Sequence, residues 1–380
     1  NLSYELVDVI SKRYQPLSVN TYLTALSTFA YTDNSVETEL SNTWTAAYNT
    51  ILNCNVVLEN IDKSEGVLLT VESRVLKGEM LAVRAFLHFD MLRLFGPVYK
   101  LQPQAESIPY NESSKVVALP LLPADSVIHE KILRDLDEAE GLLADSDPVI
   151  AEGPMASLEE DQDVYLRYRQ LRMNYYAVQA LKARVYLYAG EQANALAAAR
   201  KLLTDKRVNE HFPAVDPNKL LANQTNPDRV FSTEVLAGIY KKDRKDIYTG
   251  YFSAEQAGNN YLHPRKDFVN TNLFAGETQD YRFQTWWQIA SGVGESGHVL
   301  IKYKGIDQPS GTTETEYFYA VFMSLIRLSE VYYIAAECEP VLAERYEWLN
   351  QARARRGLPN LTAVSEDDFM KRLRGEYLRE

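Results

Sequence analysis

One segment, residues 72–95, constrains the fold of this 380-residue chain more than any other. Apolar side chains recur along it at spacings of three and four, as on one face of an α-helix. The residues of this stripe are Leu76, Met80, Val83, Leu87, Met91 and Leu94. Phe86 and Phe89 lie on a second stripe. Because a helix with two apolar faces is buried from two sides, the segment predicts a stack of helices.

The same spacing predicts helices before and after this segment. In residues 44–61 the repeating positions are Trp44, Tyr48, Ile51, Asn55, Leu58 and Ile61. Thr43 or Asn42 is the expected N-cap of that helix. Asp125 is the expected cap of a later helix, because it precedes a new apolar stripe. That stripe consists of Ile128, Ile132, Leu136, Ala139 and Leu143.

Two further segments are typical of helix hairpins. Residues 168–189 and 191–204 are joined at Gly190, and small residues occur where a tetratricopeptide hairpin needs close approach. These small residues are Ala183, Gly190, Ala195 and Ala199. Residues 319–338 and 341–356 have a similar form. The sequence therefore predicts a mostly α fold, in which tetratricopeptide-like helix pairs form a scaffold.

Residues 205–318 differ from the rest of the chain in composition and periodicity. They are rich in Asn, Asp, Gly, Pro and aromatic residues, and they lack a sustained helical period. Short strand-like runs occur at 234–240 and 298–303. We expect a single domain, with a helical scaffold in about 1–204 and 319–380 and a loop-rich ligand-side region in about 205–318. An irregular region of this length is typically functional.

Composition excludes several classes of protein. The net charge of -12 argues against binding to nucleic acid and against a basic helix on anionic lipid. No run of about 18 apolar residues is present, so no membrane-spanning helix is expected. The two cysteines, Cys54 and Cys338, are interpreted as buried free thiols. The chain begins at Asn1 with neither Met nor a signal peptide, as a processed product does.

Motifs for chemistry are weak. The G-x-G-x-x-G pattern at 292–297 precedes a strand-like run instead of following one, which favours a loop. The five histidines are scattered without zinc-type spacing. The acid pairs Asp145/Asp147 and Asp161/Asp163 lack the Gly turn and distal Glu of a calcium loop, so solvated acids are expected. No G-x-S-x-G elbow occurs. We therefore expect no enzyme, no cofactor and no metal.

Four stretches carry a family resemblance. They are 44–61 with the pattern W-x3-Y-x2-I-x3-N-x2-L-x2-I, 78–98 with GEMLAVRA and RLFGPV, 132–139 with I-x2-DL-x2-A, and 327–359 with RLSEVY and L-N-x2-R-x2-RGLP. In this order they resemble the signature segments of the SusD/RagB family of outer-membrane nutrient-binding lipoproteins. Ion pairs and hydrogen bonds inside the helix array are the expected role of their charged residues. These residues are Glu79, Arg84, Arg327, Glu330 and Glu337.

The chain departs from the family pattern at several points. Met80, Val83, Pro97 and Tyr99 stand where the family usually has Ala, Leu, Asp and Pro. The lipid-carrying Cys expected near the mature N-terminus is missing. The sequence stops at Glu380, inside what resembles a family helix rich in Glu and Arg, so ligand contacts from a later segment are unknown.

The resemblance implies non-catalytic binding of a nutrient, an oligosaccharide first of all, at the outer-membrane surface. It also implies delivery to a SusC-like TonB-dependent transporter and a lipid anchor outside this chain. A peptide-binding member of the family is the alternative. A helical-repeat adaptor for a protein partner requires a continuous concave array, which the irregular region argues against. A hydrolase is the weakest interpretation, because abundant acids carry no signal.

A ligand site is expected in the irregular region, where aromatic rings could stack on sugar faces and polar groups could bind hydroxyls. The candidate ligand-binding residues are Tyr248, Tyr251, Tyr261, Trp286, Trp287, Asn260 and Arg265. The nearby Phe252, Tyr303, Asn259 and Gln288 are secondary candidates. At least one of Trp286 and Trp287 is expected to belong to the core, whereas Tyr251 and Tyr261 are expected to be exposed.

Overall fold

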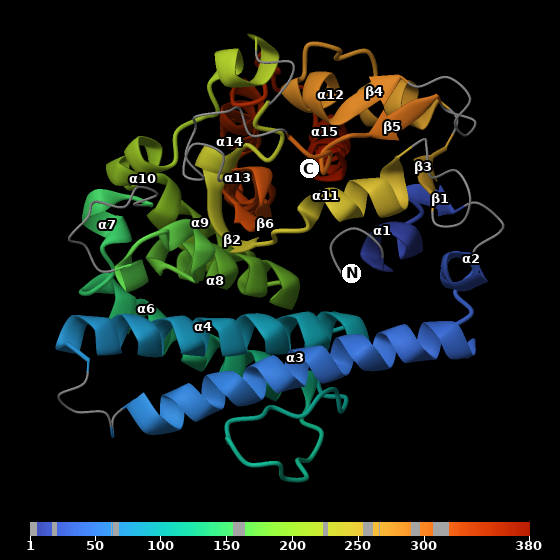
Figure 1. Cartoon of the computed structure of the whole chain (residues 1–380). Helices are drawn as coiled ribbons and strands as arrows, with labels where there is room; N and C mark the ends of the chain where they lie inside the picture. Colours follow the sequence, from blue (N-terminus) through green and yellow to red (C-terminus); the bar gives the residue numbers. More distant parts are fainter. Residues whose placement is uncertain are drawn as a thin grey trace.

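The computed structural model describes residues 6–16, 21–61, 63, 68–154, 164–222, 227–253, 261–265, 267–289, 297–306 and 319–380. The protein is mostly helical, as predicted (Figure 1). The long helices are α3 (Asn34–Ile61), α4 (Thr70–Phe95), α6 (Leu133–Ala144), α8 (Tyr175–Ala189), α9 (Gln192–Leu203), α13 (Leu328–Cys338), α14 (Leu342–Ala354) and α15 (Glu366–Arg379). Within the described residues, no helix is long and apolar enough to cross a membrane.

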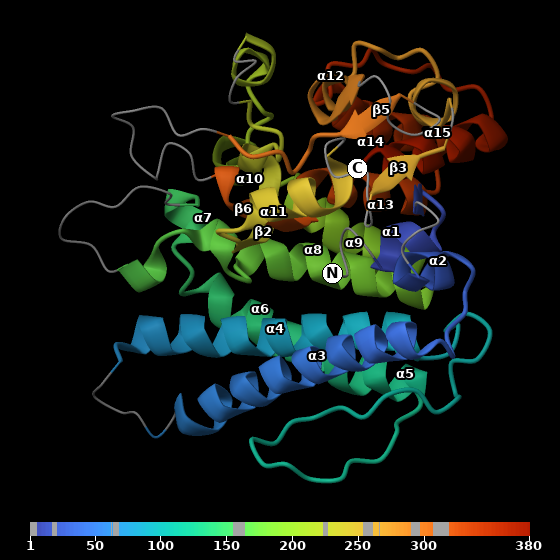
Figure 2. The ribbon, with the colours of Figure 1, turned by 45° about the vertical axis from the view of Figure 1, so that its right-hand side comes forward.

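The long helices form a stack. α3 and α4 lie side by side in the lowest layer of Figures 1 and 2, α6 packs on α4, and α8 packs on α6. The stack continues through α9 and α13 to α14. The predicted burial of α4 from two sides is confirmed. Its fully buried residues include Val75, Ala82, Ala85, Phe89 and Leu92, while most of the predicted stripe is half-buried on another face.

Gly78 explains the close approach of α4 and α6. A Cβ atom at this position would lie 2.7 Å from Cγ of Leu143 and 3.3 Å from the carbonyl oxygen of Ala139. A side chain at Gly78 would therefore push α6 outward, so the glycine sets the distance between these two helices.

Two predicted helix starts are wrong. α3 begins at Asn34, where Oδ1 of Asp33 accepts a hydrogen bond from the amide of Ser35 (2.9 Å), so Thr43 and Asn42 lie inside the helix. α5 (Ala124–Ser126) follows Pro123, and Asp125 instead accepts a hydrogen bond from the Tyr99 hydroxyl (2.7 Å). In both cases a residue upstream of the expected cap begins the helix.

The hairpin of α8 and α9 is confirmed, with a shorter first helix than predicted. Oδ1 of Asn174 accepts a hydrogen bond from the amide of Ala177 (3.0 Å) and caps α8. Gly190 ends α8 with φ of 81°, a conformation that favours glycine. The small residues Ala183, Ala195 and Ala199 are fully buried, as close helix packing requires.

The predicted helix 319–338 is half wrong, because its first part is a strand. β6 (Phe322–Arg327) pairs antiparallel with β2 (Val235–Tyr240), which confirms the predicted strand at 234–240. A Cβ atom at Gly238 would lie 2.3 Å from the Phe322 ring, so only glycine lets that ring cross the strand. α13 begins after this strand at Leu328.

The irregular region holds short elements around a second core. β1 (Tyr14–Pro16) pairs with β3 (Leu262–Pro264), and β4 (Trp287–Ile289) pairs with β5 (His298–Leu300), the second predicted strand. Side chains from residues 6–36 pack in this core with Phe231, Phe252 and Trp286. The remaining elements are α1 (Val7–Ile10), α2 (Thr21–Ser27), η2 (Val127–Ile132), α7 (Val149–Glu152), η3 (Val164–Leu166), η4 (Arg169–Leu171), α10 (Lys206–His211), η5 (Asn218–Ala222), η6 (Ser232–Glu234), α11 (Arg244–Ile247), η7 (Tyr248–Phe252), η9 (Phe268–Leu273) and α12 (Tyr281–Trp286).

The expected ion pairs of the signature residues are confirmed in the helix stack. Nη1 of Arg169 donates to Glu79 (2.5 Å), and Nε of Arg84 donates to Asp135 (2.6 Å). Nε of Arg184 donates to Glu330 (2.5 Å). For one acid, however, the expectation of a solvated side chain is wrong.

That acid is Asp147, which is buried and not solvated, because its two oxygens accept hydrogen bonds from Arg169 (2.8 and 3.0 Å). Asp145 is the exposed member of the pair, and Asp161 and Asp163 lie outside the described residues.

The two remaining signature residues also have hydrogen-bond partners. Tyr377 donates to Glu337 (3.1 Å), and Arg327 donates to Ser324 (2.9 Å).

Cys54 and Cys338 are buried free thiols, as expected. Burial raises the pKa of the Cys54 thiol to about 11. Cys54 is buried on α3 and Cys338 lies on α13 in the main core, so both act as small apolar residues.

Candidate functional site

Three of the predicted aromatic residues are half-buried at the second core. Tyr248 and Tyr251 lie on η7, and Trp287 begins β4. Each packs partly on buried apolar side chains, which restricts the motion of its ring. A restrained ring with part of its surface free is suited to stacking on a flat ligand.

Two predicted ligand residues are interior, which corrects the expectation for them. Tyr261 was expected to be exposed but is only 1% exposed, with its ring stacked beside His263 at 5.8 Å between centroids. Trp286 is 2% exposed, stacks on Phe231 and donates from Nε1 to the carbonyl oxygen of Arg229 (2.5 Å). The prediction that one of the two tryptophans belongs to the core is thereby confirmed.

Two of the four polar candidates lie within the described residues. Arg265 and Gln288 are exposed. Asn260, like Asn259 and most of the glycine-rich stretch at 292–297, lies outside the described residues. Tyr251 is half-buried and therefore less exposed than expected.

A cavity of about 420 Å³ is lined by other residues, none of which is a predicted ligand residue. Its polar lining residues are Arg229, Gln284 and Thr285, and its apolar lining residues are Leu220, Leu221, Pro227 and Ile301. It adjoins the buried Trp286, because Ile301 donates its amide hydrogen to the Trp286 carbonyl (2.7 Å) and Arg229 accepts from the indole. A volume of this size is within the range of small-molecule pockets.

Arg229 is the unusual member of this lining. It is 6% exposed, and within the described part of the chain Nε and Nη1 have no hydrogen-bond partner. Burial lowers the pKa of its guanidinium, and the charge of the Tyr248 and Tyr319 phenol groups opposes this effect without outweighing it. A buried guanidinium normally has carboxylate or carbonyl partners, so these free donors mark a place where a ligand could bind.

A second arginine adds to the positive charge. Arg244 is 2% exposed, and its Nη1 donates to the carbonyl oxygen of Phe322 (3.3 Å) while Nε has no partner among the described residues. Burial lowers the pKa of Arg244 to about 10, the charge of Asp228 raises it, and the charge of Arg229 lowers it further. The carboxylate of Asp228 accepts from the amide (2.9 Å) and hydroxyl (2.7 Å) of Ser232, so it is already engaged.

No sequence pattern indicates this arrangement. Arg229 follows a stretch of the sequence that is rich in Asn and contains Pro, where an arginine is ordinarily solvated. The residues of the cavity come from three separate stretches, 220–229, 284–285 and 301, which lie together only in the folded chain.

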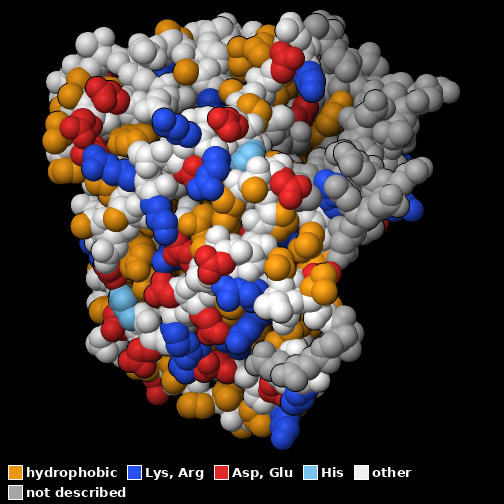
Figure 3. Space-filling view, turned by 90° about the vertical axis from the view of Figure 1, so that its left-hand side faces the viewer, with side chains coloured by type: hydrophobic (Ala, Val, Ile, Leu, Met, Phe, Trp, Pro, Cys, Tyr) orange, Lys and Arg blue, Asp and Glu red, His pale blue; other side chains and the backbone are white. Residues whose placement is uncertain are grey.

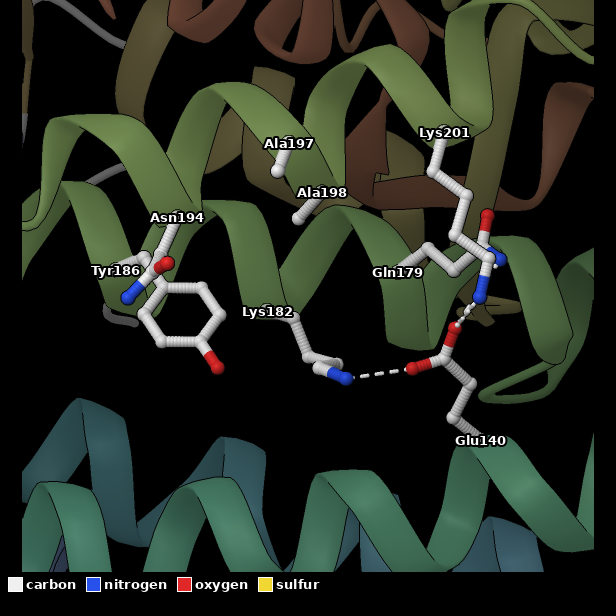
Figure 4. Close-up of a pocket in the computed structure, with 8 residues that line it drawn as sticks. All are labelled: Glu140, Gln179, Lys182, Tyr186, Asn194, Ala197, Ala198 and Lys201. Atoms are coloured by element: carbon white, nitrogen blue, oxygen red, sulfur yellow. Dashed lines mark hydrogen bonds and ion pairs between the residues drawn. The ribbon is translucent and has the colours of Figure 1, made fainter.

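A second hollow, of about 250 Å³, lies on α6, α8 and α9 (Figure 4). There Glu140 accepts hydrogen bonds from Lys182 (2.5 Å) and Lys201 (2.6 Å). Tyr186 and Asn194 line the other end, and Ala197 and Ala198 lie between. Since its main charged groups already neutralise one another, this hollow creates less demand for a ligand than the cavity at Arg229.

The surface of the helix stack has a similar character. Viewed from the side of α7 and α10, acidic and basic side chains are intermingled (Figure 3). Charges of both signs at close spacing largely cancel beyond about one Debye length. The unbalanced charge of Arg229 contrasts with this pattern. No cluster of His, Cys, Asp and Glu within the described ranges could hold a metal ion.

Comparison with known families gives two matches. Residues 9–151 match a family described as starch-binding associating with outer membrane. Residues 209–380 match the SusD family. Together the two matches cover most of the chain. No curated protein sequence matches it.

Comparison with solved structures gives a consistent fold. A SusD-like carbohydrate binding protein from Bacteroides vulgatus is 20% identical, with a TM-score of 0.72, and the match covers 99% of this chain and 74% of that one. A laminarin binding SusD-like protein is 18% identical, with a TM-score of 0.66 and coverage of 99% and 84%.

A third similar structure contains a ligand. It is surface glycan-binding protein A from Bacteroides thetaiotaomicron in complex with laminarihexaose. The identity is 17%, the TM-score is 0.66, and the match covers 100% of this chain and 83% of that one. At such identities the likeness establishes a shared fold.

Proposed function

The chain belongs to the SusD/RagB family, and on this premise we propose that it binds an oligosaccharide at the cell surface without changing it chemically. Proteins of this family bind carbohydrate and are not enzymes. The observation that carries the proposal is the cavity at Arg229, which combines polar and apolar side chains. Sugars need both, because their C–H faces pack on apolar groups while their hydroxyls form hydrogen bonds.

The aromatic residues extend this site in the proposal. Tyr248, Tyr251 and Trp287 offer half-buried rings to successive sugar units, and the exposed Arg265 binds hydroxyls. Trp286 and Tyr261 support the surrounding structure from the interior. Asn260 remains a candidate for hydroxyl binding. Relatives that bind laminarin or laminarihexaose support this assignment of ligand class.

We also propose that the protein delivers its ligand to a SusC-like TonB-dependent transporter and is held at the outer membrane by a lipid anchor. Apolar exposure supports a docking surface on segment 96–123, which extends below α3 in Figures 1 and 2. Val116 is 93% exposed, Leu101 75% and Val98 65%. Surfaces that expose several large apolar residues are typical of protein contacts.

The glycan proposal predicts measurable binding that depends on the aromatic residues. We expect calorimetry and native affinity gels to detect one class of glycan in a panel of plant, host and microbial polysaccharides. Tyr251→Ala or Trp287→Ala should weaken that binding by about tenfold or more, since a lost stacking contact is worth roughly 1–3 kcal/mol. Tyr186→Ala, in the hollow of Figure 4, serves as the control and should leave binding unchanged.

Two results would contradict the glycan proposal. If a peptide pool binds and no glycan does, the peptide-binding alternative replaces it. If a glycan binds equally well to both aromatic variants, the ligand lies elsewhere on the molecule. Circular dichroism and thermal unfolding of each variant separate lost binding from lost folding.

A further inference from the structure

The charge balance around the cavity is uneven. Arg229 has no ion pair with any described carboxylate, and its charge is close enough to Arg244 to lower the pKa of that second guanidinium. Asp228, whose charge acts on Arg244, already accepts hydrogen bonds from Ser232 and from the amide of Val230 (3.3 Å). The cavity therefore has a fixed positive charge that the described protein does not neutralise.

A structural arginine in the same region has very different surroundings. Arg282 is fully buried, yet it donates to Asp280 (2.7 and 3.0 Å), Glu376 (2.5 Å) and Glu380 (3.1 Å). Burial of a guanidinium is costly unless such partners are present. Arg229 carries that cost without the compensation, which is expected of a residue whose partner arrives with a ligand.

We propose that the cavity lined by Arg229 binds a carboxylate-bearing sugar, so that the natural ligand is an acidic oligosaccharide such as a uronic-acid polymer. This inference rests on the proposed function, because it names the substrate class of that same site. The planar guanidinium matches a carboxylate in shape and charge, and it can form two parallel hydrogen bonds.

The other lining residues suit the remainder of such a sugar. The exposed amide of Gln284 can bind ring hydroxyls. Thr285 donates its hydroxyl hydrogen to the Tyr281 carbonyl (2.6 Å), which leaves its oxygen free to accept. Leu220 and Ile301 provide apolar contact for the C–H face. A cavity of about 420 Å³ holds one or two sugar units.

The net charge of -12 does not prevent such a ligand from binding. The Debye length is about 8 Å at physiological ionic strength, so the overall negative charge is screened. Arg229 lines the cavity and acts on a bound ligand at much shorter range, where screening is weak. The positive charge at the cavity therefore determines whether an acidic or a neutral sugar binds more tightly.

The test compares charged and neutral forms of the same glycan. Binding of the wild-type chain to oligogalacturonate, oligomannuronate and a hyaluronan hexasaccharide is measured by calorimetry, each beside its methyl ester, with laminarihexaose as a neutral glycan. We expect one acid to bind at least about tenfold more tightly than its ester. In Arg229→Gln this preference should disappear.

Lys201→Gln is the matched control, because it also removes one positive charge but lies in the hollow of Figure 4. It should keep the preference for the acid. Thermal unfolding gives an independent readout. Removing an unpaired buried charge should raise the unliganded melting temperature of Arg229→Gln by about 1–3 °C, whereas loss of a structural arginine would lower it.

The outcomes separate this inference from the proposed function. Equal binding of acid and ester, or binding of laminarihexaose alone with Arg229→Gln unaffected, overturns the acidic ligand but leaves glycan binding standing. Binding of a peptide carboxylate through Arg229, with no glycan bound, overturns both. Binding of none of the three acids overturns the acidic ligand, while the wider polysaccharide panel decides the glycan proposal.

Discussion

At the scale of the residue, Asp135 links two signature helices. It is fully buried and accepts hydrogen bonds from Arg84 (2.6 and 2.9 Å), the Tyr110 hydroxyl (2.6 Å) and Arg134 (2.8 Å). Burial alone would raise the pKa of Asp135, but the hydrogen bonds and charge of Arg84 outweigh burial, and the net effect lowers it. The ionised carboxylate therefore stabilises the fold.

Asp135→Asn should lower the free energy of unfolding by about 3 kcal/mol at pH 7, because it leaves Arg84 buried without an anion. Because the pKa of Asp135 is lower in the folded chain than in the unfolded chain, its carboxylate stabilises the fold above the unfolded pKa of about 4. This stabilisation is lost as the pH falls through the folded pKa. The difference between wild type and variant should consequently narrow in acid. Urea denaturation at pH 7 and pH 3.5 measures both effects.

Asp145→Asn is the control for this prediction. Asp145 pairs with Arg74 (3.0 Å), but its side chain is 78% exposed, so its loss should cost less than about 1 kcal/mol. If Asp135→Asn proves as mild as this exposed substitution, Asp135 is not the anchor between α4 and α6.

At the scale of the element, whether a segment formed the predicted helix depended on the elements packed beside it. The sequence of 322–327 is compatible with a helix, yet β2 presents an unpaired strand beside it and Gly238 leaves room for Phe322. Backbone hydrogen bonds to β2 then outweigh local helical preference. α4 had no such competing partner, so its periodicity alone predicted it correctly.

His129 connects two elements and should make that connection sensitive to pH. Its Nδ1 lies 3.0 Å from Asp125, and its Nε2 lies 2.5 Å from Glu191 in the turn between α8 and α9. Burial lowers the pKa of His129, but the hydrogen bond to Glu191 and the charge of Asp125 outweigh it, so the net effect is a raised pKa. Because the pKa of His129 is higher in the folded chain than in the unfolded chain, its protonated ring stabilises the fold below the unfolded pKa of about 6.5. This stabilisation is lost as the pH rises through the folded pKa.

Glu191→Gln should therefore lower the pKa of His129, as measured by NMR titration of its ring protons. Glu130→Gln is the neighbouring control, since Glu130 accepts from Ser126 (3.2 Å) and has no contact with the imidazole in the described structure. An unchanged titration in Glu191→Gln would show that this ion pair does not form in solution.

At the scale of the whole molecule, a buried charge network joins the helix stack to the loop-rich region. Glu376 on α15 accepts from Arg282 (2.5 Å), Arg353 (2.7 Å) and Arg379 (3.1 Å), which come from α12, α14 and α15. Burial alone would raise the pKa of Glu376, but the charge of Arg282 and its neighbours lowers it. The network holds α12 and the neighbouring cavity in place relative to the stack.

The opposite end of the molecule provides the proposed transporter contact. Val116→Glu combined with Leu101→Glu should reduce co-purification with the SusC-like barrel by about tenfold or more, because charge in an apolar contact is strongly unfavourable. Glycan binding and melting temperature should not change, since both residues are exposed. Val364→Glu, also at an exposed valine (73%), is the control. Undiminished co-purification of the double variant would place the contact elsewhere.

The sequence by itself determined the helix stack, the α8–α9 hairpin and the β2 strand. These features depend on local spacing, such as the stripes of 72–95 and the glycine at 190, which the chain carries wherever it folds. The family was indicated by the resemblance of four stretches to its signature segments. It also predicted that Arg84 and Glu79 are partnered, because buried charges must be. It could not name Asp135 and Arg169, which are 51 and 90 residues away.

Only the tertiary structure decided which aromatic rings are buried and where unpaired charge lies. Tyr261 and Trp286 look like ligand residues in a loop-rich sequence, but both are buried: Trp286 packs in the second core with Phe231, and the Tyr261 ring stacks on His263. Arg229 looks like a solvated arginine until the fold surrounds it. Burial and charge balance are sums over residues distant in sequence, and no local pattern contains them.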